Sequence, residues 1–161
     1  MKKNEREKII KTAIQMAKNA QKADEVPVGA VIFNTQTGEI LSKAHNQTEK
    51  DKNVLAHAEM LAIRKATKKL KRKFLDGYSM FVTLEPCCMC AGAIAWARLD
   101  ELYYGATDPK TGAIRQGAKV FARPQTHHKI KLQLKNTPVC AQVMRDFFQK
   151  KRLEKKTQNP K

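Results

Sequence analysis

"YSMFVTLE" (residues 78–85), "CCMCAGAIAWARL" (residues 87–99) and "DELYYGATD" (residues 100–108) follow one another along the chain and decide its fold. The first and third segments are short and rich in aromatic and branched residues, which is typical of buried strands. The segment between them is apolar on every side and therefore predicts a helix buried against a sheet. Two strands joined by a helix form a crossover, so we expect the sheet to be at least partly parallel.

The flanking segments extend this pattern in both directions. They predict an opening helix to about residue 21, a hairpin of strands at 26–34 and 39–46, a helix at 56–70, a fifth strand at 127–134 and a closing helix at 138–152. Helices on both faces of such a sheet make an α/β fold, a three-layer α/β/α sandwich with a mixed five-stranded sheet. The sequence has no repeats and no long linker, so we expect one domain at residues 1–155 and a basic tail at 156–161.

The charge of the 161-residue chain is strongly positive. Lys and Arg number 32 against 15 Asp and Glu, which gives a formal net charge of +17. Such a field attracts polyanions such as a phosphate backbone, although surface lysines that only solvate the protein would give the same composition. The charge is concentrated at residues 64–73 and 149–161. The N-terminus reads as an amphipathic docking helix and not as a secretory signal, so we expect a cytoplasmic protein without a membrane span.

Three residues form a candidate metal site. Cys87 and Cys90 have C-x-x-C spacing at a predicted helix start, where free N–H groups and the helix dipole stabilise thiolates. His57 lies at the start of another predicted helix and supplies a third ligand. One His and two Cys suit Zn²⁺, and three protein ligands leave the fourth position open, as in catalytic zinc sites.

Cys88 leaves two other interpretations open. If it also bound the ion, the site would be closed and structural, and a disulfide within the cluster is a further alternative. Neighbouring residues of a helix project about 100° apart, so we expect Cys88 to point away from the ion and into the core.

Glu59 follows His57 by two residues. A carboxylate beside an activated water is suited to shuttle protons, whereas a glutamate in a first helical turn also has a purely structural explanation. H-x-E combined with P-C-x-x-C is a known signature of zinc nucleobase deaminases, and the chain carries both parts. The combination favours the catalytic interpretation.

Six segments resemble bacterial tRNA-specific adenosine deaminases: "VPVGAV", "AHN", "AHAEMLAIR", "VTLEPCCMCAGAI", "YYGATDPKTGA" and "FFQKKR". The resemblance extends from about residue 25 to residue 152. It implies a homodimer with the cytidine deaminase fold and one Zn²⁺ per subunit. It also implies conversion of adenosine to inosine at the wobble position of a tRNA anticodon loop.

The resemblance assigns roles to individual residues. It implies that His57, Cys87 and Cys90 bind zinc, that Glu59 moves protons, and that Asn46 hydrogen-bonds the flipped base. Near the metal, Ala58 and Pro86 are expected to contact the substrate, and the basic patch of the last helix offers candidate RNA contacts in Arg145, Lys150, Lys151 and Arg152.

Two rival functions remain open at this point. One is a deaminase of a free base or nucleoside such as guanine, cytosine or cytidine, which has no need of a net charge of +17. The other is a zinc-stabilised RNA-binding protein, which has no need of Glu59. Residues 114–129 depart from the family pattern.

Smaller features have plain explanations. His127 and His128 suggest a second metal site, but paired histidines near a strand are more often surface residues. Cys140 is expected in the core, and Trp96 is expected in packing or in a subunit interface.

Overall fold

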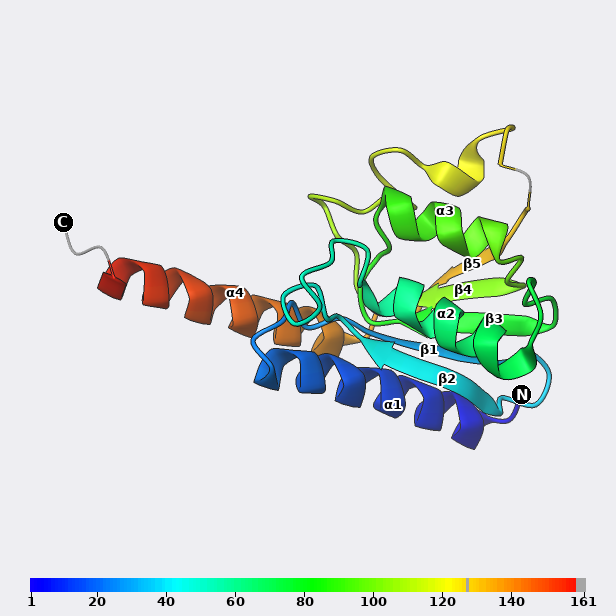
Figure 1. Cartoon of the computed structure of the whole chain (residues 1–161), viewed down its shortest axis with the longest axis horizontal. Coiled ribbons are helices and arrows are strands. Elements are labelled where there is room, and N and C mark those ends of the chain that lie inside the picture. Colours follow the sequence, from blue (N-terminus) through cyan, green and yellow to red (C-terminus); the bar gives the residue numbers. More distant parts are fainter. Residues whose placement is uncertain (127, 159–161) are drawn as a thin grey trace.

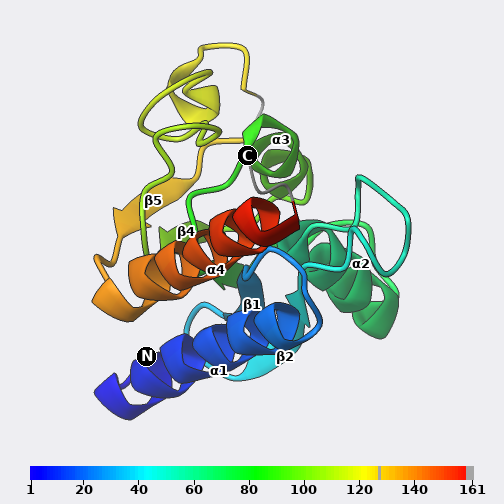
Figure 2. The same cartoon turned by 90° about the vertical axis from the view of Figure 1, so that its left-hand side faces the viewer.

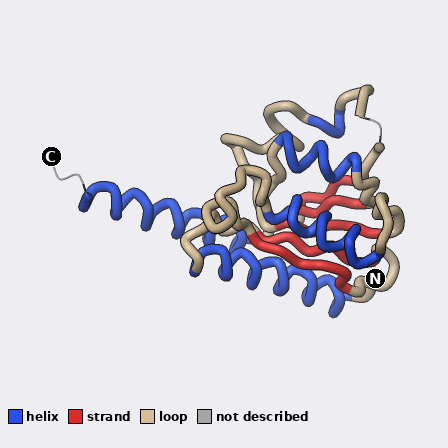
Figure 3. Tube along the Cα trace, viewed as in Figure 1, coloured by secondary structure: helices blue, strands red, loops and turns tan. Residues whose placement is uncertain are grey.

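The structure is a computed structural model, and it describes residues 1–126 and 128–158. Its elements, shown in Figures 1 and 3, are α1 (Lys3–Lys22), β1 (Gly29–Asn34), β2 (Ile40–His45), α2 (Ala58–Leu70), β3 (Tyr78–Val82), α3 (Cys88–Trp96), β4 (Glu101–Tyr104), the 3₁₀ turn η1 (Val120–Ala122), β5 (Lys131–Leu134) and α4 (Pro138–Gln158). The predicted order of helices and strands is confirmed, and η1 was not predicted.

The five strands form one mixed sheet in the order β2-β1-β3-β4-β5. β1 pairs antiparallel with β2 and with β3, whereas β3, β4 and β5 run parallel to one another. The predicted hairpin is therefore β1–β2, and the crossover predicted from residues 78–108 is β3–α3–β4. This crossover matters for function because it brings the start of α3 to the same end of the sheet as the start of α2 (Figure 1).

Helices cover both faces of the sheet, as expected for a three-layer sandwich. Successive residues of a strand point to opposite faces. Ile32 and Met80 accordingly lie in the larger core beneath α2 and α3. Val31 and Phe81 lie in the smaller core beneath α1. The alternation explains why the central residues of both strands are apolar and buried on both faces.

α1 approaches the sheet closely because the facing residues are small. Ala13 and Ala17 on α1 are fully buried. A Cβ atom added to Gly29 would lie 2.7 Å from the Ala17 nitrogen and would also overlap the Ala13 carbonyl oxygen. Glycine at the start of β1 is therefore required by the helix that crosses it.

α4 begins beside the end of β4, where a Cβ added to Gly105 would lie 3.0 Å from the Cys140 Cβ. The helix then passes the C-terminal end of α1 and continues beyond the sheet (Figures 1 and 2). Cys140 and Phe147 are buried, which confirms the prediction for Cys140, whereas Phe148 is 44% exposed. α4 continues through Gln158. The division of the chain at residue 155 stays a prediction, since residues 159–161 lie outside the described ones.

The segment that departs from the family pattern packs onto the α3 side of the sheet. Ile114 and Phe121 are buried in the larger core, and η1 contacts α3. Trp96, at the end of α3, is 68% exposed and therefore lies outside that core. Among the described residues, no helix has the length and apolar character that crossing a membrane would require.

Candidate metal centre and pocket

The predicted metal ligands meet where two helices begin. His57 is the N-cap residue of α2 and Cys87 is the N-cap residue of α3, and neither side chain caps its own helix. The His57 Nδ1 atom lies 3.8 Å from the Cys87 Sγ atom and 3.5 Å from the Cys90 Sγ atom. All three donor atoms lie within 4.8 Å of one another. The structure thus brings the three predicted ligands together.

The spacing of these donors fits a tetrahedral zinc ion. Zn–N and Zn–S bonds of about 2.0 and 2.3 Å at a tetrahedral angle place nitrogen and sulfur roughly 3.5 Å apart. The distance from His57 Nδ1 to the Cys90 Sγ atom, 3.5 Å, matches that value, and the distance to the Cys87 Sγ atom, 3.8 Å, is slightly longer. One imidazole and two thiols also match the preference of Zn²⁺ for nitrogen and sulfur. The residues present therefore can hold the metal with one coordination position left for another molecule.

The pKa values of the two thiols are shifted in opposite directions. A hydrogen bond with Cys90, together with His57, lowers the pKa of Cys87 to about 4. The hydrogen bond with Cys87, together with burial, raises the pKa of Cys90 well above its usual range. The hydrogen bond with Cys87 also raises the pKa of His57. The lowered pKa favours the thiolate form of Cys87, which lies at a helix N-terminus whose dipole also favours an anion.

Glu59 lies in the first turn of α2, two residues after the metal ligand His57, and is 4% exposed. Loss of solvation on burial raises the pKa of its carboxyl to about 7. A carboxyl group with such a pKa can both accept and donate a proton near neutral pH, which is what general acid–base catalysis needs. The side chain lines the same cavity as His57 and Cys87.

The prediction that Cys88 lies in the core is wrong, because Cys88 is exposed. Its side chain does point away from the metal ligands, as the helical geometry required. The physical reason for the difference is the position of the first turn of α3 at the mouth of the site: Cys90 faces inward and is buried, so the opposite side of that turn meets solvent. Among the described residues, the metal-binding group consists of His57, Cys87 and Cys90 without Cys88.

The ligands open into a cavity of about 660 Å³. One wall is formed by Val26, Val28, Asn46 and Thr48, the second by residues 106–111, and the third by the first half of α4. Cavities that bind small molecules are commonly about 300–1,000 Å³. The space is therefore adequate for a nucleobase with part of its sugar.

The predicted substrate residues lie at or next to this cavity. Asn46 lines the cavity and is 5% exposed. Ala58 and Pro86 are fully buried and precede Glu59 and Cys87 in the chain. The Pro86 carbonyl oxygen accepts a hydrogen bond from the Ala113 N–H at 3.0 Å, which attaches the second wall to the start of α3.

The predicted RNA contacts are divided along α4. Arg145 lines the cavity, whereas Lys150, Lys151 and Arg152 lie further along the helix. Lys151 pairs with Asp24 at 2.6 Å, and Lys150 pairs with Glu154 at 3.8 Å. Of these four basic residues, Arg145 is therefore the one that lies in the same cavity as His57, Glu59 and Cys87.

The second wall depends on Glu85, which the sequence argument did not single out. Its carboxylate is 3% exposed and accepts hydrogen bonds from the backbone N–H groups of Asp108, Ile114 and Arg115 at 3.0, 3.0 and 2.8 Å. A Cβ atom on Gly112 would lie 2.6 Å from the Glu85 Cδ atom, so the loop closes tightly around the carboxylate. The available signal was a glutamate placed between a buried strand and the P-C-x-x-C motif.

The histidines outside the site have ordinary surroundings. The His45 Nδ1 atom lies 2.9 Å from the Asn46 carbonyl oxygen, and His128 Nε2 lies 3.0 Å from the Leu99 carbonyl oxygen. His127 lies outside the described residues, so the pairing considered for a second metal is not described.

Comparison with known proteins gives consistent results. The model of the MafB19-like deaminase family matches residues 4–152. The tRNA-specific adenosine deaminase of Agrobacterium fabrum is 41% identical over 152 residues, which cover 93% of this chain and 98% of that protein. The tRNA-specific adenosine deaminase of Bacillus subtilis is 38% identical over 150 residues, or 91% of each chain.

Solved structures show the same relationship. A structure from work on A-to-I editing by tRNA:A34 deaminases at the wobble position of transfer RNA has a TM-score of 0.80 and 39% identity, and covers 84% of this chain and 97% of that one. The guanine deaminase of Nitrosomonas europaea has a TM-score of 0.72 at 24% identity, and covers 86% of this chain and 82% of that one. This second likeness concerns the fold.

Proposed function

The chain belongs to the MafB19-like deaminase family and to the bacterial tRNA-specific adenosine deaminases, and on that premise we propose that it converts adenosine to inosine at the wobble position of a tRNA anticodon. The observation that carries the proposal is the arrangement of the site. The metal-binding group of His57, Cys87 and Cys90 adjoins a cavity that the buried carboxyl of Glu59 lines.

Zinc is the cofactor that the donor set supports, with one ion per subunit held by His57, Cys87 and Cys90. When bound, Zn²⁺ supplies Lewis-acid activation, which lowers the pKa of a water molecule from 15.7 to about 7.

Glu59 moves the protons of the reaction. It takes a proton from the attacking water and delivers it to N1 of adenine as the oxygen adds to C6. It then takes the proton of the new C6 hydroxyl and passes it to the amino group, so that ammonia leaves and C6 becomes the carbonyl of inosine. Burial suits Glu59 to both steps, because it raises the pKa of the carboxyl towards neutral pH.

Asn46 and the backbone beside the metal orient the base. The Asn46 amide lies in the cavity wall and is proposed to hydrogen-bond the flipped base. Ala58 is the first residue of α2, so its N–H has no partner within the helix and is available to the reacting group. Pro86, which precedes Cys87 in the chain, is proposed to contact the substrate beside the metal.

The positive charge supports an RNA substrate. An anticodon loop presents unstacked bases, which enter such a pocket at small cost, and the net charge of +17 attracts its phosphates. Arg145 is proposed to contact RNA at the cavity, with Lys150, Lys151 and Arg152 further along α4. We further propose a homodimer in the cytoplasm, where tRNA is modified, and a single deaminase domain at residues 1–155 with a basic tail at 156–161.

The deciding experiment measures inosine and ammonia released by zinc-loaded protein. The substrates are an anticodon stem-loop with a wobble adenosine and, separately, free adenosine, guanine, cytosine and cytidine. Inosine in the stem-loop alone is the expected result. Turnover of a free base with the stem-loop unchanged would overturn the tRNA assignment and favour the alternative of a free-base or nucleoside deaminase.

Glu59→Gln separates catalysis from simple RNA binding. Because general acid–base catalysis contributes about 10²- to 10⁴-fold, we expect the turnover rate to fall by at least about 100-fold while zinc content and folding are retained. Loss of zinc in this variant would instead assign Glu59 a structural role.

A further inference from the structure

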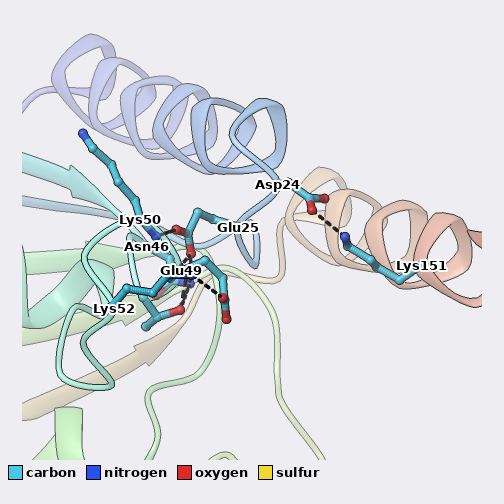
Figure 4. A network of polar contacts seen from close by, with 8 residues as sticks. Asp24, Glu25, Asn46, Glu49, Lys50, Lys52 and Lys151 are labelled. Atoms are coloured by element: carbon cyan, nitrogen blue, oxygen red, sulfur yellow. Dashed lines mark hydrogen bonds and ion pairs between the residues drawn. The ribbon is translucent and has the colours of Figure 1, made fainter. Parts of the chain in front are cut away.

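Glu25 is a buried carboxylate outside the catalytic group. It lies between α1 and β1 and is 1% exposed. Its Oε1 atom accepts a hydrogen bond from the Lys50 backbone N–H at 2.7 Å, and its Oε2 atom accepts one from the Glu49 backbone N–H at 3.1 Å. The Thr48 hydroxyl at 3.3 Å and the Asn46 amide nitrogen at 3.4 Å complete its surroundings (Figure 4).

These donors all come from one segment, residues 46–50. Within residues 1–126 and 128–158, no lysine, arginine or histidine forms an ion pair with Glu25. A buried charge is costly unless it is hydrogen-bonded, so the carboxylate and the segment depend on each other. Glu25 therefore determines where this segment lies.

The segment matters because it forms the first cavity wall. Asn46 and Thr48 line the cavity, and so do Val26 and Val28, which follow Glu25 in the chain. The Asn46 backbone N–H also donates to the Val28 carbonyl oxygen at 3.1 Å. The Asn46 side chain is thus attached to the wall through Glu25 and its backbone through Val28.

The neighbouring residue is attached to the third wall. Asp24 has a positive φ of 60° and pairs with Lys151 of α4 at 2.6 Å (Figure 4). α4 supplies Met144, Arg145 and Phe148 to the cavity lining. Two consecutive acidic residues therefore hold elements on both sides of the cavity.

We propose that Glu25 is a positioning residue that sets the Asn46 amide for recognition of the base. The inference rests on the proposed function, since it assigns Glu25 an effect on the contact between Asn46 and adenosine. Glu25 is not part of the cavity lining, and it acts through Asn46.

Glu25→Gln is a suitable test because it preserves size while it removes the negative charge and replaces one of the two acceptor oxygens by an NH₂ donor. Both carboxylate oxygens accept from backbone N–H groups, so a glutamine amide in either orientation points its NH₂ group at a donor. Misplacement of a positioning group costs up to about 100-fold. We expect Glu25→Gln to lower kcat/KM on the stem-loop by about 10- to 100-fold, with zinc content unchanged.

A double-mutant cycle with Asn46→Ala distinguishes positioning from general damage. If Glu25 acts through Asn46, the double variant is no worse than Asn46→Ala alone, within about twofold. Glu85→Gln is the matched control, because Glu85 is a buried carboxylate that holds the second wall. The fold-loss of kcat/KM caused by Glu85→Gln should multiply with the fold-loss caused by Asn46→Ala. Losses of Glu25→Gln and Asn46→Ala that multiply would overturn the proposal.

Amide hydrogen exchange tests the positioning without activity. Glu25→Gln should accelerate exchange at Glu49 and Lys50 and leave Ile114 and Arg115 protected. Unchanged exchange at Glu49 and Lys50 overturns the inference even if the wild-type protein is inactive on the stem-loop. An inactive wild-type protein with the expected exchange pattern overturns the proposed function and the effect on adenosine, while Glu25 keeps its place in the wall.

Discussion

The Nδ1 atom of His57 and the Sγ atom of Cys90 lie 3.5 Å apart although 33 residues separate them in the chain. The contact exists because α2 and α3 both begin at the same end of the sheet (Figure 1). The start of α2 contributes one donor atom and the start of α3 contributes two. The crossover between β3 and β4 is therefore what assembles the metal-binding group.

Cys90 and Cys88 give a first prediction. Cys90→Ser should abolish stoichiometric zinc and remove the stabilisation that bound metal provides, which is about 4 kcal/mol when free zinc is a thousandfold above its Kd. Cys88→Ser should retain zinc, because Cys88 is exposed and outside the metal-binding group. Metal analysis and thermal unfolding with and without a chelator check this. Loss of zinc in Cys88→Ser would contradict this prediction and favour the interpretation of a closed structural site in which Cys88 is the fourth ligand.

Gly29 gives a prediction about folding. Gly29→Ala places a methyl group 2.7 Å from the Ala17 nitrogen, so the helix must shift, and we expect destabilisation of about 1–3 kcal/mol or more. Gly92→Ala is the control, because a Cβ there meets no atom within 4 Å and alanine favours the helix. Urea unfolding of both variants measures the difference. Equal stability of the two variants would contradict the close approach of α1.

Arg145 gives a prediction about RNA binding. Arg145→Ala should raise KM for the stem-loop by about 3- to 10-fold and reduce the salt dependence of binding by about one phosphate contact. Lys68→Ala, which removes an exposed charge from α2, should change KM by less than about twofold. KM at several salt concentrations checks both variants. Equal effects would mean that net charge alone attracts the RNA.

Glu101 gives a prediction about pH. Although burial opposes it, the hydrogen bond from Tyr103 and the charge of Lys131 hold the pKa of Glu101 below its usual value. A lowered pKa contributes stability above the unfolded-state value, and this stability is lost as the pH falls through the folded-state value. Glu101→Gln should therefore reduce the free energy of unfolding by about 0.5–1 kcal/mol at pH 7 and by less as the pH falls below about 4.

The comparison needs a control at an unpaired carboxylate. Glu39 is exposed, so Glu39→Gln should change stability little at any pH. Urea unfolding of the wild type and both variants at pH 7, 5 and 3.5 gives the profile. A difference for Glu101→Gln that stays constant over this range would exclude the proposed ionic origin.

Much of this organisation is local and therefore predictable. Apolar runs and helical periodicity gave the order of strands and helices, and the C-x-x-C spacing with a distant histidine gave the metal-binding group. The burial of Cys88 was predicted wrongly because helix geometry gives the direction of a side chain relative to its neighbours and says nothing of what lies there.

The features that escaped prediction are those that depend on distant segments. Glu25 and Glu85 resemble surface glutamates in the sequence, and only the folded chain surrounds them with N–H groups from residues 49–50 and 108–115. Residues of α4 line the cavity because α4 passes the ends of β4 and α1. No periodicity in the sequence contains that information.

Glu25 and Glu85 hold their loops mainly through backbone groups, and every residue except proline supplies a backbone N–H. Glu85 binds the N–H groups of Ile114 and Arg115, which open the segment that departs from the family pattern. Side chains at these loop positions can therefore be exchanged while the loop backbone keeps its place. These backbone hydrogen bonds make the loops around the cavity tolerant of substitution, so that the substrate preference can change while the metal-binding group stays the same.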